Sequence, residues 1–413
     1  MKQKGKRTLT PKLRFPEFRD KGEWEPTTIG EHVNLLSGFP FEGMDIIEDS
    51  AGVPLMRGIN ITEGRIRHDP DYDRFYLGPT ENLAKYRLQE GDLVIGMDGS
   101  KVGKNSAMIT SADIGALLVQ RVARLRSDRQ VTMSFIFQIV TSPKFHSYVD
   151  RINTSSGIPH ISSKQINDFP LAIPCDAEQQ KIAECLGSLD GLIAAEVRKL
   201  AGLRDHKRGL MQQLLPQPGQ TQPRLRFPEF RDKGEWEEKP LSVIAENLDN
   251  KRVPITESDR IKGDIPYYGA SGIVDYVRDY IFDEDLLCVS EDGANLVART
   301  YPIAFPISGK TWVNNHAHVL RFDKPATQKM VEDYLNSTDL RDFITGMAQP
   351  KLNRTMLDTI PIPLPEQEEQ KRIADCLTAL DDRITAQAAK IDALKTHKRG
   401  LMHQLFAAPE EHK

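Results

Sequence analysis

One stretch of the sequence has the spacing of a nucleotide-binding loop. Residues 304–311 read AFPISGKT, which fits the loosest such pattern: Gly or Ala, four residues, then Gly-Lys-Thr. A loop that cradles phosphates needs a glycine-rich backbone leading directly into a helix, because its N–H groups must converge on the phosphate oxygens. This stretch contains Pro306 and continues into TWVNNHAHVLRF, which is typical of a strand. We interpret the match as a coincidence and expect Lys310 to contact a phosphate in another setting.

Other catalytic and metal-binding motifs are absent from the sequence. An adenine methyltransferase needs an Asn/Asp-Pro-Pro-aromatic motif, yet the chain has no Pro-Pro dipeptide, and neither H-E-x-x-H nor G-x-S-x-G occurs. The four cysteines, Cys175, Cys185, Cys288 and Cys376, form no C-x-x-C pair and lack histidines at zinc spacing. We therefore expect no catalytic residue, no metal site and four reduced thiols.

A second glycine-rich stretch, GMDGSKVGKNS, covers residues 96–106. Its glycines and lysines could bring backbone N–H groups and positive charge to a phosphate. It could equally be an ordinary loop between two strands.

The elements that would position these loops are duplicated. LRFPEFRDKGEW occurs at residues 13–24 and again, unchanged, at residues 225–236; we call these two copies the frame segments. A longer segment from Glu178 returns from Glu369, and both copies share the tail HKRGLM. Two nearly identical surfaces are suited to binding two copies of one partner about a pseudo-twofold axis.

The longer repeats have the apolar periodicity of long helices. Apolar residues recur at spacings of three, four or seven in both copies, register for register, which predicts two antiparallel helices that pack as a coiled coil. A helix of 33 residues is about 50 Å long at ~1.5 Å per residue. The positions expected to pack the pair are Ile182, Leu186, Leu189, Ile193 and Leu200, and Ile373, Leu377, Leu380, Ile384 and Ile391.

Between these repeats lie two cassettes of short strand-like runs and Gly- and Asp-rich turns, which share little sequence. The predicted order is an N-terminal frame (1–24), a first cassette (25–176), a long helix (177–216), a linker and frame (217–236), a second cassette (237–365), and a long helix with a tail (366–413). The fold class is therefore α+β: two mixed α/β cassettes separated by a pseudo-symmetric helix pair.

In this arrangement the chain resembles the HsdS specificity subunits of type I restriction-modification systems. The resemblance covers nearly the whole chain. It is carried by LRFPEF, LQEGDLVIGMDGSKVG, GIPHISSKQINDFPLAIP, YYGASGIVDYV, QPKLNRTMLDTIPIPLPEQEEQKRIA and both HKRGLM tails.

The resemblance implies that each cassette is a target recognition domain for one half of a bipartite site in double-stranded DNA. The helices would space the domains and dock two copies of a methyltransferase subunit, joined by restriction and translocase subunits. It implies no cofactor in this chain, with S-adenosylmethionine, ATP and Mg²⁺ on the partner subunits. The helix length agrees with half-sites about 34 Å apart, one turn of B-DNA.

Direct readout of bases needs side chains with paired donors and acceptors on loops that can enter a groove. The candidates in the first cassette are Arg57, Asn60, Lys101, Lys104, Asn105, Gln120, Ser155, Ser156 and His160. Those in the second are Tyr267, Tyr268, Ser271, Lys310, Asn314, Asn315, His316, Gln349, Lys351 and Asn353. The alternative for each is a turn residue or a buried hydrogen-bonding group.

Net charge argues against tight DNA binding by this chain alone. The formal net charge is −4, and residues 25–176 carry 15 Lys and Arg against 19 Asp and Glu. Residues 237–365 carry 14 against 20. We expect the isolated chain to bind DNA weakly and a complex with methyltransferase subunits to bind well, because the partners would neutralise further phosphates.

Two other functions remain open at this level. One is a pseudo-symmetric scaffold for a protein partner without DNA readout; the other is an ATP-dependent nuclease built around AFPISGKT. The sequence has no apolar run of the roughly 18 residues that a bilayer span needs and no apolar stretch of a signal peptide, so we expect a cytoplasmic protein.

Overall fold

The computed structural model describes residues 9–153, 159–217, 219–346 and 348–407. The chain forms two compact units, one from Met1–Glu196 with Lys390–Lys413 and one from Val197–Ala389. Two long helices, α4 (Asp176–Leu214) and α9 (Gln367–Leu405), contribute to both units. Whereas the sequence-based boundaries set the helices apart from the cassettes, each structural unit combines one frame segment, one cassette and a part of each long helix.

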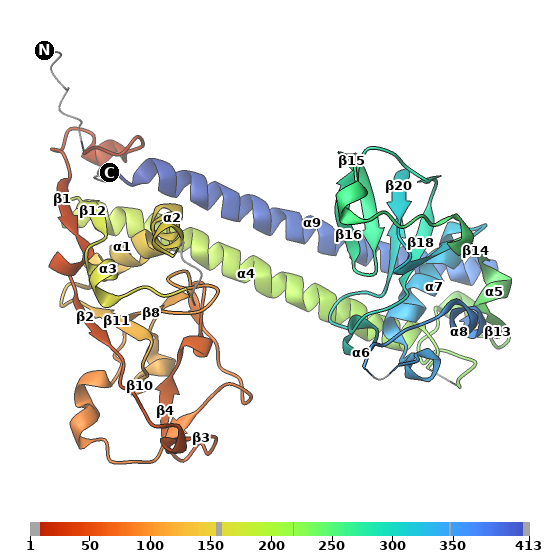
Figure 1. Ribbon diagram of the computed structural model, residues 1–413, viewed down its shortest axis with the longest axis horizontal. Coiled ribbons are helices and arrows are strands. Elements are labelled where there is room, and N and C mark those ends of the chain that lie inside the picture. Colours follow the sequence, from red (N-terminus) through yellow and green to blue (C-terminus); the bar gives the residue numbers. More distant parts are fainter. Residues whose placement is uncertain (1–8, 154–158, 218, 347, 408–413) are drawn as a thin grey trace, which may run out of the picture. The chain divides into compact units, whose positions relative to one another are not determined.

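The first unit holds short sheets and three short α-helices beside the long ones (Figure 1). A ladder pairs β1 (Glu25–Thr28) with β12 (Pro170–Ile173), and a small hairpin pairs β5 (Ile61–Thr62) with β6 (Arg65–Ile66). One four-stranded sheet has the order β2 (Asn34–Ser37), β11 (Val122–Arg126), β8 (Leu93–Gly96), β9 (Ser106–Met108). The other has the order β10 (Leu117–Leu118), β4 (Val53–Met56), β7 (Phe75–Tyr76), β3 (Ile46–Ile47). The short helices are α1 (Gln130–Val140), α2 (Pro143–Ile152) and α3 (Ser163–Asn167).

The second unit is built from a similar set of elements. Its ladder pairs β13 (Glu237–Pro240) with β22 (Pro361–Leu364). One sheet has the order β14 (Glu246–Asn247), β21 (Ala317–Arg321), β18 (Leu286–Ser290), β19 (Ala304–Ile307). The other has the order β16 (Gly272–Val277), β15 (Lys262–Gly269), β20 (Lys310–Val313), β17 (Phe282–Asp283). The short helices are α5 (Leu241–Ile244), α6 (Asn295–Ala298), α7 (Pro325–Ser337) and α8 (Arg354–Thr359).

The two cassettes share one topology although their sequences share little. The sheet β2-β11-β8-β9 corresponds strand by strand to β14-β21-β18-β19. In the other sheet of the first cassette, β4 pairs in parallel with β10 and antiparallel with β7. In the second cassette β15 pairs in the same way, in parallel with β20 and antiparallel with β16. These two sheets differ only in the position of the remaining edge strand. Topology depends on which strands are buried and where the chain turns, so it survives the loss of sequence identity.

Each frame segment binds the first turn of a long helix through a buried ion pair. Arg14 donates from Nε and Nη2 to both carboxylate oxygens of Glu178, at 2.8 and 2.7 Å. In the second unit Arg226 forms the same bidentate pair with Glu369, at 2.7 Å for both bonds. Carboxylates are favoured in the first turn of a helix, where the backbone N–H groups lack partners. The ion pair therefore binds the frame arginine to a glutamate that is itself favoured at the helix start.

The same frame segment also holds the end of the other long helix. In the first unit the N–H of Leu13 donates to the carbonyl of Gln404 in α9, at 3.0 Å. In the second unit the N–H of Leu225 donates to the carbonyl of Gln213 in α4, at 2.8 Å. Carbonyls in the last turn of a helix have no partner within it, so the frame satisfies them. Each frame thus joins the start of one helix to the end of the other.

The lysine of the shared tail HKRGLM explains why that tail recurs. Lys398 of α9 forms an ion pair with Asp190 of α4, at 2.6 Å, and Lys207 of α4 pairs with Asp381 of α9, at 2.7 Å. In the first unit Lys390 of α9 also meets Glu196 of α4, which shows that the two helices run antiparallel. The predicted fold class, with its pseudo-symmetric antiparallel pair, is confirmed.

The expected packing positions differ in burial along the helices. Ile182, Leu186, Ile373, Leu377, Leu380 and Ile391 are buried, and Leu189, Ile193, Leu200 and Ile384 are half-buried. Near the helix starts the buried residues pack into the cassette cores together with the end of the other helix: Ile182 with Met402 and Leu405, and Ile373 with Met211 and Leu214. These residues therefore serve both helix pairing and cassette docking. No helix in the described ranges is long and apolar enough to cross a bilayer.

The Arg14–Glu178 pair gives a stability prediction. Replacing Arg14 with Met leaves a buried carboxylate without its cation, so we expect the free energy of unfolding of the first unit to fall by about 3–5 kcal/mol. Urea denaturation of the full chain measures this loss. The double variant Arg14→Met, Glu178→Met should recover much of it.

Lys181→Met provides the matched control. Lys181 contacts Glu17 at 3.4 Å, and both side chains are about half exposed. Its removal should change the unfolding free energy by no more than about 0.5 kcal/mol. An equal loss of unfolding free energy in Arg14→Met and Lys181→Met would contradict the role given to the buried pair.

Candidate nucleic-acid interface

An Asp-Gly turn follows the central strand of the same sheet in both cassettes. Asp98 and Gly99 follow β8, and Asp292 and Gly293 follow β18. Both glycines have positive φ, 90° and 106°, a conformation that glycine adopts without steric cost. The N–H of Gly99 donates to the carbonyl of Pro159, and that of Gly293 to the carbonyl of Pro350, each at 3.1 Å. The turn is therefore held against a second loop in the same way twice.

That second loop places a basic residue beside the aspartate. The N–H of Ile161 donates to the carbonyl of Met97, at 2.9 Å, and the N–H of Leu352 to that of Glu291, at 2.8 Å. The isolated bridges between Asp98 and His160 and between Asp292 and Lys351 follow from these bonds.

A third segment, directly before β11 or β21, completes the arrangement. Arg121 donates from Nη1 to Asp98 Oδ2 at 2.8 Å, and Nδ1 of His316 lies 2.7 Å from Asp292 Oδ2. The carbonyl of Arg121 accepts a hydrogen bond from the backbone N–H of Met97, and that of His316 accepts one from the N–H of Glu291, both at 2.9 Å. Arg121 has φ 71°, which is uncommon for a residue other than glycine and is a frequent property of functional positions.

We call each set of three segments a DG module. The first comprises Met97–Gly99, Gln120–Arg121 and Pro159–Ile161; the second comprises Glu291–Gly293, Asn315–His316 and Pro350–Leu352. The exposed side chains are Gln120, Arg121 and His160 in the first and Asn315, His316 and Lys351 in the second. In the first, a cavity of about 440 Å³ opens between Gln120, Arg121, His160, Asp98, Met97 and Ser37. Amide, guanidinium and ammonium groups, which Gln120, Asn315, Arg121 and Lys351 carry, are among those that read base edges in the major groove.

The second DG module rests on a buried network of charged groups. His318 is 0% exposed, with Nδ1 2.6 Å from Asp249 Oδ2 and Nε2 2.7 Å from the carbonyl oxygen of Leu352. Both ring nitrogens lie within hydrogen-bond distance of an oxygen, so the ring connects Asp249 to the loop at Leu352. Burial by itself raises the pKa of Asp249, but the hydrogen bond and charge of His318, with further contacts, hold that pKa below its ordinary value. His318 therefore ties the loop that carries Lys351 to the core of the cassette.

The comparisons with known proteins agree with this duplicated architecture. A family model described as the type I restriction modification DNA specificity domain matches residues 21–204 and 233–396, one match per cassette. This chain belongs to that family.

Its relatives are specificity subunits of the same kind. Over 149 residues the chain is 38% identical to a putative type I restriction enzyme specificity subunit of Haemophilus influenzae; this is 35% of the chain and 38% of that protein. It is 30% identical to the EcoAI specificity subunit of Escherichia coli over 41% of the chain and 28% of that protein. The matched stretches thus span less than two fifths of either relative.

Two matches extend over nearly the whole chain. The MjaVIII specificity subunit of Methanocaldococcus jannaschii is 22% identical over 423 aligned residues, 95% of this chain and 93% of that protein. The crystal structure of a type I restriction-modification S subunit from M. genitalium aligns with a TM-score of 0.57 and 15% identity, over 97% of this chain and 100% of that one. At this identity the structural match shows the fold of the type I specificity family.

The DG modules bring together five of the residues predicted from sequence: Gln120 and His160 in the first cassette, and Asn315, His316 and Lys351 in the second. Gln349 is exposed beside Pro350, and Ser271 is exposed in the turn between β15 and β16. Lys310 is exposed, with its Nζ 4.6 Å from the centroid of the Tyr280 ring. These eight side chains remain candidates for contact with a ligand.

Other candidates lie away from the modules or have protein partners. Lys101 pairs with Glu63 at 2.9 Å and Lys104 with Asp150 at 2.8 Å, much as Lys351 of the second DG module pairs with Glu291 at 3.1 Å; the two lysines of the glycine-rich loop, however, lie outside the first DG module. Arg57, Asn105 and Tyr268 are half-buried. Ser155 and Ser156 lie outside the described residues.

For four candidates the structure gives a role inside the fold instead. Asn60 is 2% exposed and donates to Asp73 at 2.8 Å, and Tyr267 is 1% exposed with its hydroxyl between the N–H and carbonyl of Ile255. Asn314 is buried and accepts from the N–H of His316. Asn353 caps α8 by accepting from the N–H of Met356. For these four the structure favours the alternative, a polar group that hydrogen-bonds within its own cassette.

Two features were not predicted from the sequence: the exposed Arg121, and the equivalence of the DG modules in the two cassettes. The signal was present: a buried strand followed by Asp-Gly, and later Pro, a basic residue, a branched apolar residue and Ser or Asn, as IPHIS in one cassette and QPKLN in the other. Neither pattern is informative alone, because only the fold shows that the two stretches are in contact.

The stretch AFPISGKT forms strand, turn and strand, not a phosphate-cradling loop. It covers β19, a turn with Gly309 at φ 64°, and the start of β20, and no helix follows it. Interpreting the match as a coincidence is therefore confirmed.

Among the described residues, two clusters have ligand atoms close enough together for a cation: Asp249 with Glu291 and His318, and Glu332 with Asp333 and Asp381. Each already holds basic side chains. Arg252 donates to Glu291 at 2.7 Å, and Lys329 lies 2.7 Å from Asp381. We therefore assign neither cluster to a metal.

The buried histidine gives a prediction for the second DG module. In a His318→Gln variant the loop at Leu352 loses the imidazole that bonds its carbonyl, and a buried acceptor left unsatisfied costs about 1–3 kcal/mol. We expect amide hydrogen exchange at Leu352 to speed up by roughly 10- to 100-fold. The equivalent amide of Ile161 in the first cassette should be unaffected and serves as the internal control. Unchanged exchange at Leu352 would show that His318 does not hold the loop.

Proposed function

We propose that this chain is the DNA-specificity subunit of a type I restriction-modification complex. Each cassette reads one half of a bipartite site in double-stranded DNA. The observation that carries this proposal is the pair of DG modules: their backbones are held by equivalent hydrogen bonds, yet their exposed side chains are Gln120, Arg121 and His160 in one and Asn315, His316 and Lys351 in the other. A constant backbone with variable side chains suits two readers of different sequences.

The frame segments and long helices serve the opposite purpose. Their identical residues bind each other, through Arg14 with Glu178 and Arg226 with Glu369, and so place each cassette on the helices in the same way. The helices space the cassettes and dock two copies of a methyltransferase subunit, and restriction and translocase subunits complete the complex. Identical surfaces favour identical partners.

The chain itself carries out no chemistry in this proposal. S-adenosylmethionine, ATP and Mg²⁺ act on the partner subunits, and the complex works in the cytoplasm, where its DNA lies. Membership of the type I specificity family and the strand-turn-strand form of AFPISGKT support this assignment. The alternative, a protein scaffold without DNA readout, does not account for the different side chains on matched modules.

The decisive experiment reads the DNA site directly. The chain is expressed with its methyltransferase subunit in a host without DNA methylation, and modified adenines are mapped by long-read sequencing. We expect a two-part motif with an unspecified spacer of fixed length. Unmodified DNA, or one contiguous motif, would contradict the proposal and favour the scaffold.

Substitutions in the modules should separate the two halves of the motif. Gln120→Ala should relax or change one half, and Asn315→Ala the other, because each removes an amide able to pair with a base edge. A good bidentate pair contributes ~1–3 kcal/mol of discrimination, so roughly 10- to 100-fold in preference at one position. Methylation mapping of each variant measures this. Glu90→Ala, at an exposed position of the first cassette outside the DG module, is the control and should leave both halves intact.

A further inference from the structure

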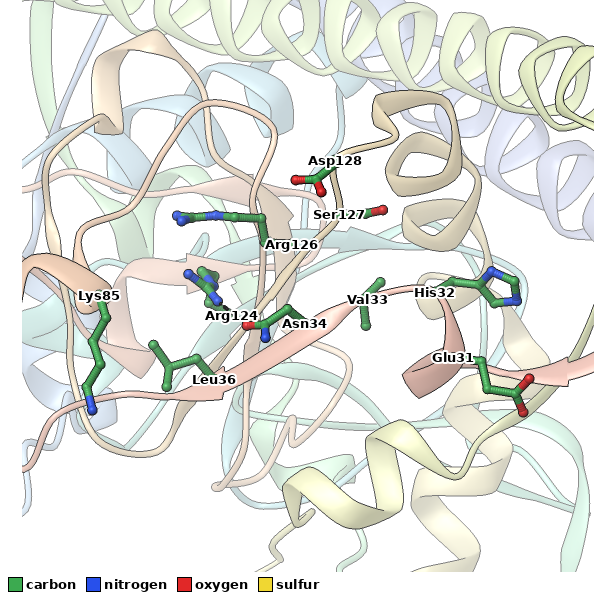
Figure 2. Close-up of a pocket in the computed structure, with 10 residues that line it drawn as sticks. All are labelled: Glu31, His32, Val33, Asn34, Leu36, Lys85, Arg124, Arg126, Ser127 and Asp128. Atoms are coloured by element: carbon green, nitrogen blue, oxygen red, sulfur yellow. Dashed lines mark hydrogen bonds between the residues drawn. The ribbon is translucent and has the colours of Figure 1, made fainter.

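A cavity of about 670 Å³ lies in the first cassette, and its lining shares no residue with the first DG module. Its lining includes Asn34 and Leu36 of β2, Arg124 and Arg126 of β11, and Lys85 of the 3₁₀ turn Glu81–Tyr86. In Figure 2 the side chains of Lys85 and Arg124 lie toward one end of the lining, and those of His32 and Glu31 lie at the opposite end. The cavity therefore has a cationic end.

Arg124 is the unusual group in this cavity. Its residue is only 4% exposed, and its Nη2 donates to Asn34 Oδ1 at 2.7 Å. Its Nε has no hydrogen-bond partner, and among the described residues no carboxylate forms an ion pair with it. A buried guanidinium ordinarily has its donors satisfied or its charge paired, because burying an isolated charge is costly.

Two other arginines show what a satisfied guanidinium looks like in this chain. Arg299 donates from Nε, Nη1 and Nη2 to the carbonyls of Leu296, Leu335 and Thr338. Arg126, two residues from Arg124 on the same strand, holds both oxygens of Asp92 at 2.6 Å. The charge of Arg126 is thus already balanced, and that of Arg124 is not.

The surroundings disfavour the charge of Arg124. Burial lowers the pKa of Arg124 and the nearby positive charge of Arg126 lowers it further, and the charge of Asp92, which raises it, does not offset them. Lys85 adds a second cation, with its Nζ 5.0 Å from the centroid of the Tyr86 ring. Two acids, Glu31 and Asp128, also line the cavity, beside His32 and Ser127.

The second cassette shows that the sheet does not require an arginine at this position. Arg124 is the third residue of β11 and faces Val94 of β8; the third residue of β21 is Val319, which faces Cys288 of β18. Val319 is 0% exposed within an apolar core. The same topology is therefore complete with valine, and Arg124 is an exception specific to the first cassette.

We propose that Arg124, with Asn34 and Lys85, forms an oxyanion site that accepts a phosphate group. The guanidinium offers its charge at the cavity wall, although its Nε–H is covered by protein. Lys85 adds a second charge, and the carboxamide of Asn34 holds the guanidinium in place. A phosphate bound there supplies the negative charge that the buried arginine lacks. The phosphate belongs either to a DNA backbone or to a free phosphate-bearing molecule; the site follows from the cavity and does not depend on the DNA-specificity function.

Binding of inorganic phosphate to the full chain tests the site. Titration calorimetry at constant ionic strength, adjusted with chloride, should show one phosphate site in the native chain and at least a tenfold loss of affinity in Arg124→Met. The exposed arginine of β6 gives the matched control: Arg65→Met should bind as the native chain does. Equal affinity in the native chain and in Arg124→Met, or no binding by the native chain, would overturn the proposal and leave a water-filled cavity.

Arg124→Val tests the site in a variant that is expected to fold, because valine (Val319) occupies the equivalent position of the second cassette. Without phosphate its unfolding temperature should equal or exceed that of the native chain, because the uncompensated charge is gone. With phosphate only the native chain should gain stability, since a ligand stabilises the state that it binds. A gain of the same size in the variant would again overturn the site.

A competition arm identifies the source of the phosphate. If DNA backbone occupies the site, duplex DNA added with the methyltransferase partner should displace inorganic phosphate, and Arg124→Met should weaken binding of all sequences alike. If DNA leaves the bound phosphate in place, the natural occupant is a free phosphate-bearing molecule.

Discussion

The buried ion pair between a frame arginine and a helix-start glutamate is the contact on which the rest of the architecture depends. Arg14 with Glu178, and Arg226 with Glu369, use both carboxylate oxygens, and the remaining arginine nitrogen bonds to carbonyls of the same frame segment. Breaking such a pair is costly because the surviving charge stays buried. The pair therefore makes the position of each frame on the helices specific, and the ladders β1–β12 and β13–β22 begin directly from that position.

This constraint explains why the two cassettes can differ so strongly in sequence while the frame segments and long helices repeat. The frame segments and the helices bind each other and also support the cassettes. Lys398 meets Asp190 and Lys207 meets Asp381, and the tryptophans that end the frame segments, Trp24 and Trp236, are buried in the unit cores. A cassette has only to preserve the strands that pack on this support. The two cassettes do so with the same sheet order, and they differ where side chains are exposed, at Gln120 and Asn315 or at Arg121 and His316.

The sequence predicted the parts of the structure that repeat along the chain. Helical periodicity showed α4 and α9, and an exact repeat marked the frames, because both signals are local or self-similar. The sequence could not show which polar loop residues are free. Asn60 and Gln120 both carry amides in turn-rich stretches. The Asn60 side chain is hydrogen-bonded to Asp73 and to backbone groups, whereas Gln120 is exposed. That difference is set by contacts between segments far apart in the chain, as is the isolation of Arg124, whose neighbours come from three separate elements.

The interleaving of the units has a consequence for the order in which the protein can be completed during synthesis. The second unit is one continuous stretch, Val197–Ala389, so all of its residues are available once that stretch has emerged. The first unit begins at the N-terminus but takes Met402 and Leu405 from the end of α9 into its core. Domains usually fold in the order in which they are made. Here the unit that is translated first is the last to receive its full core, and until then the apolar surface that awaits α9 is uncovered.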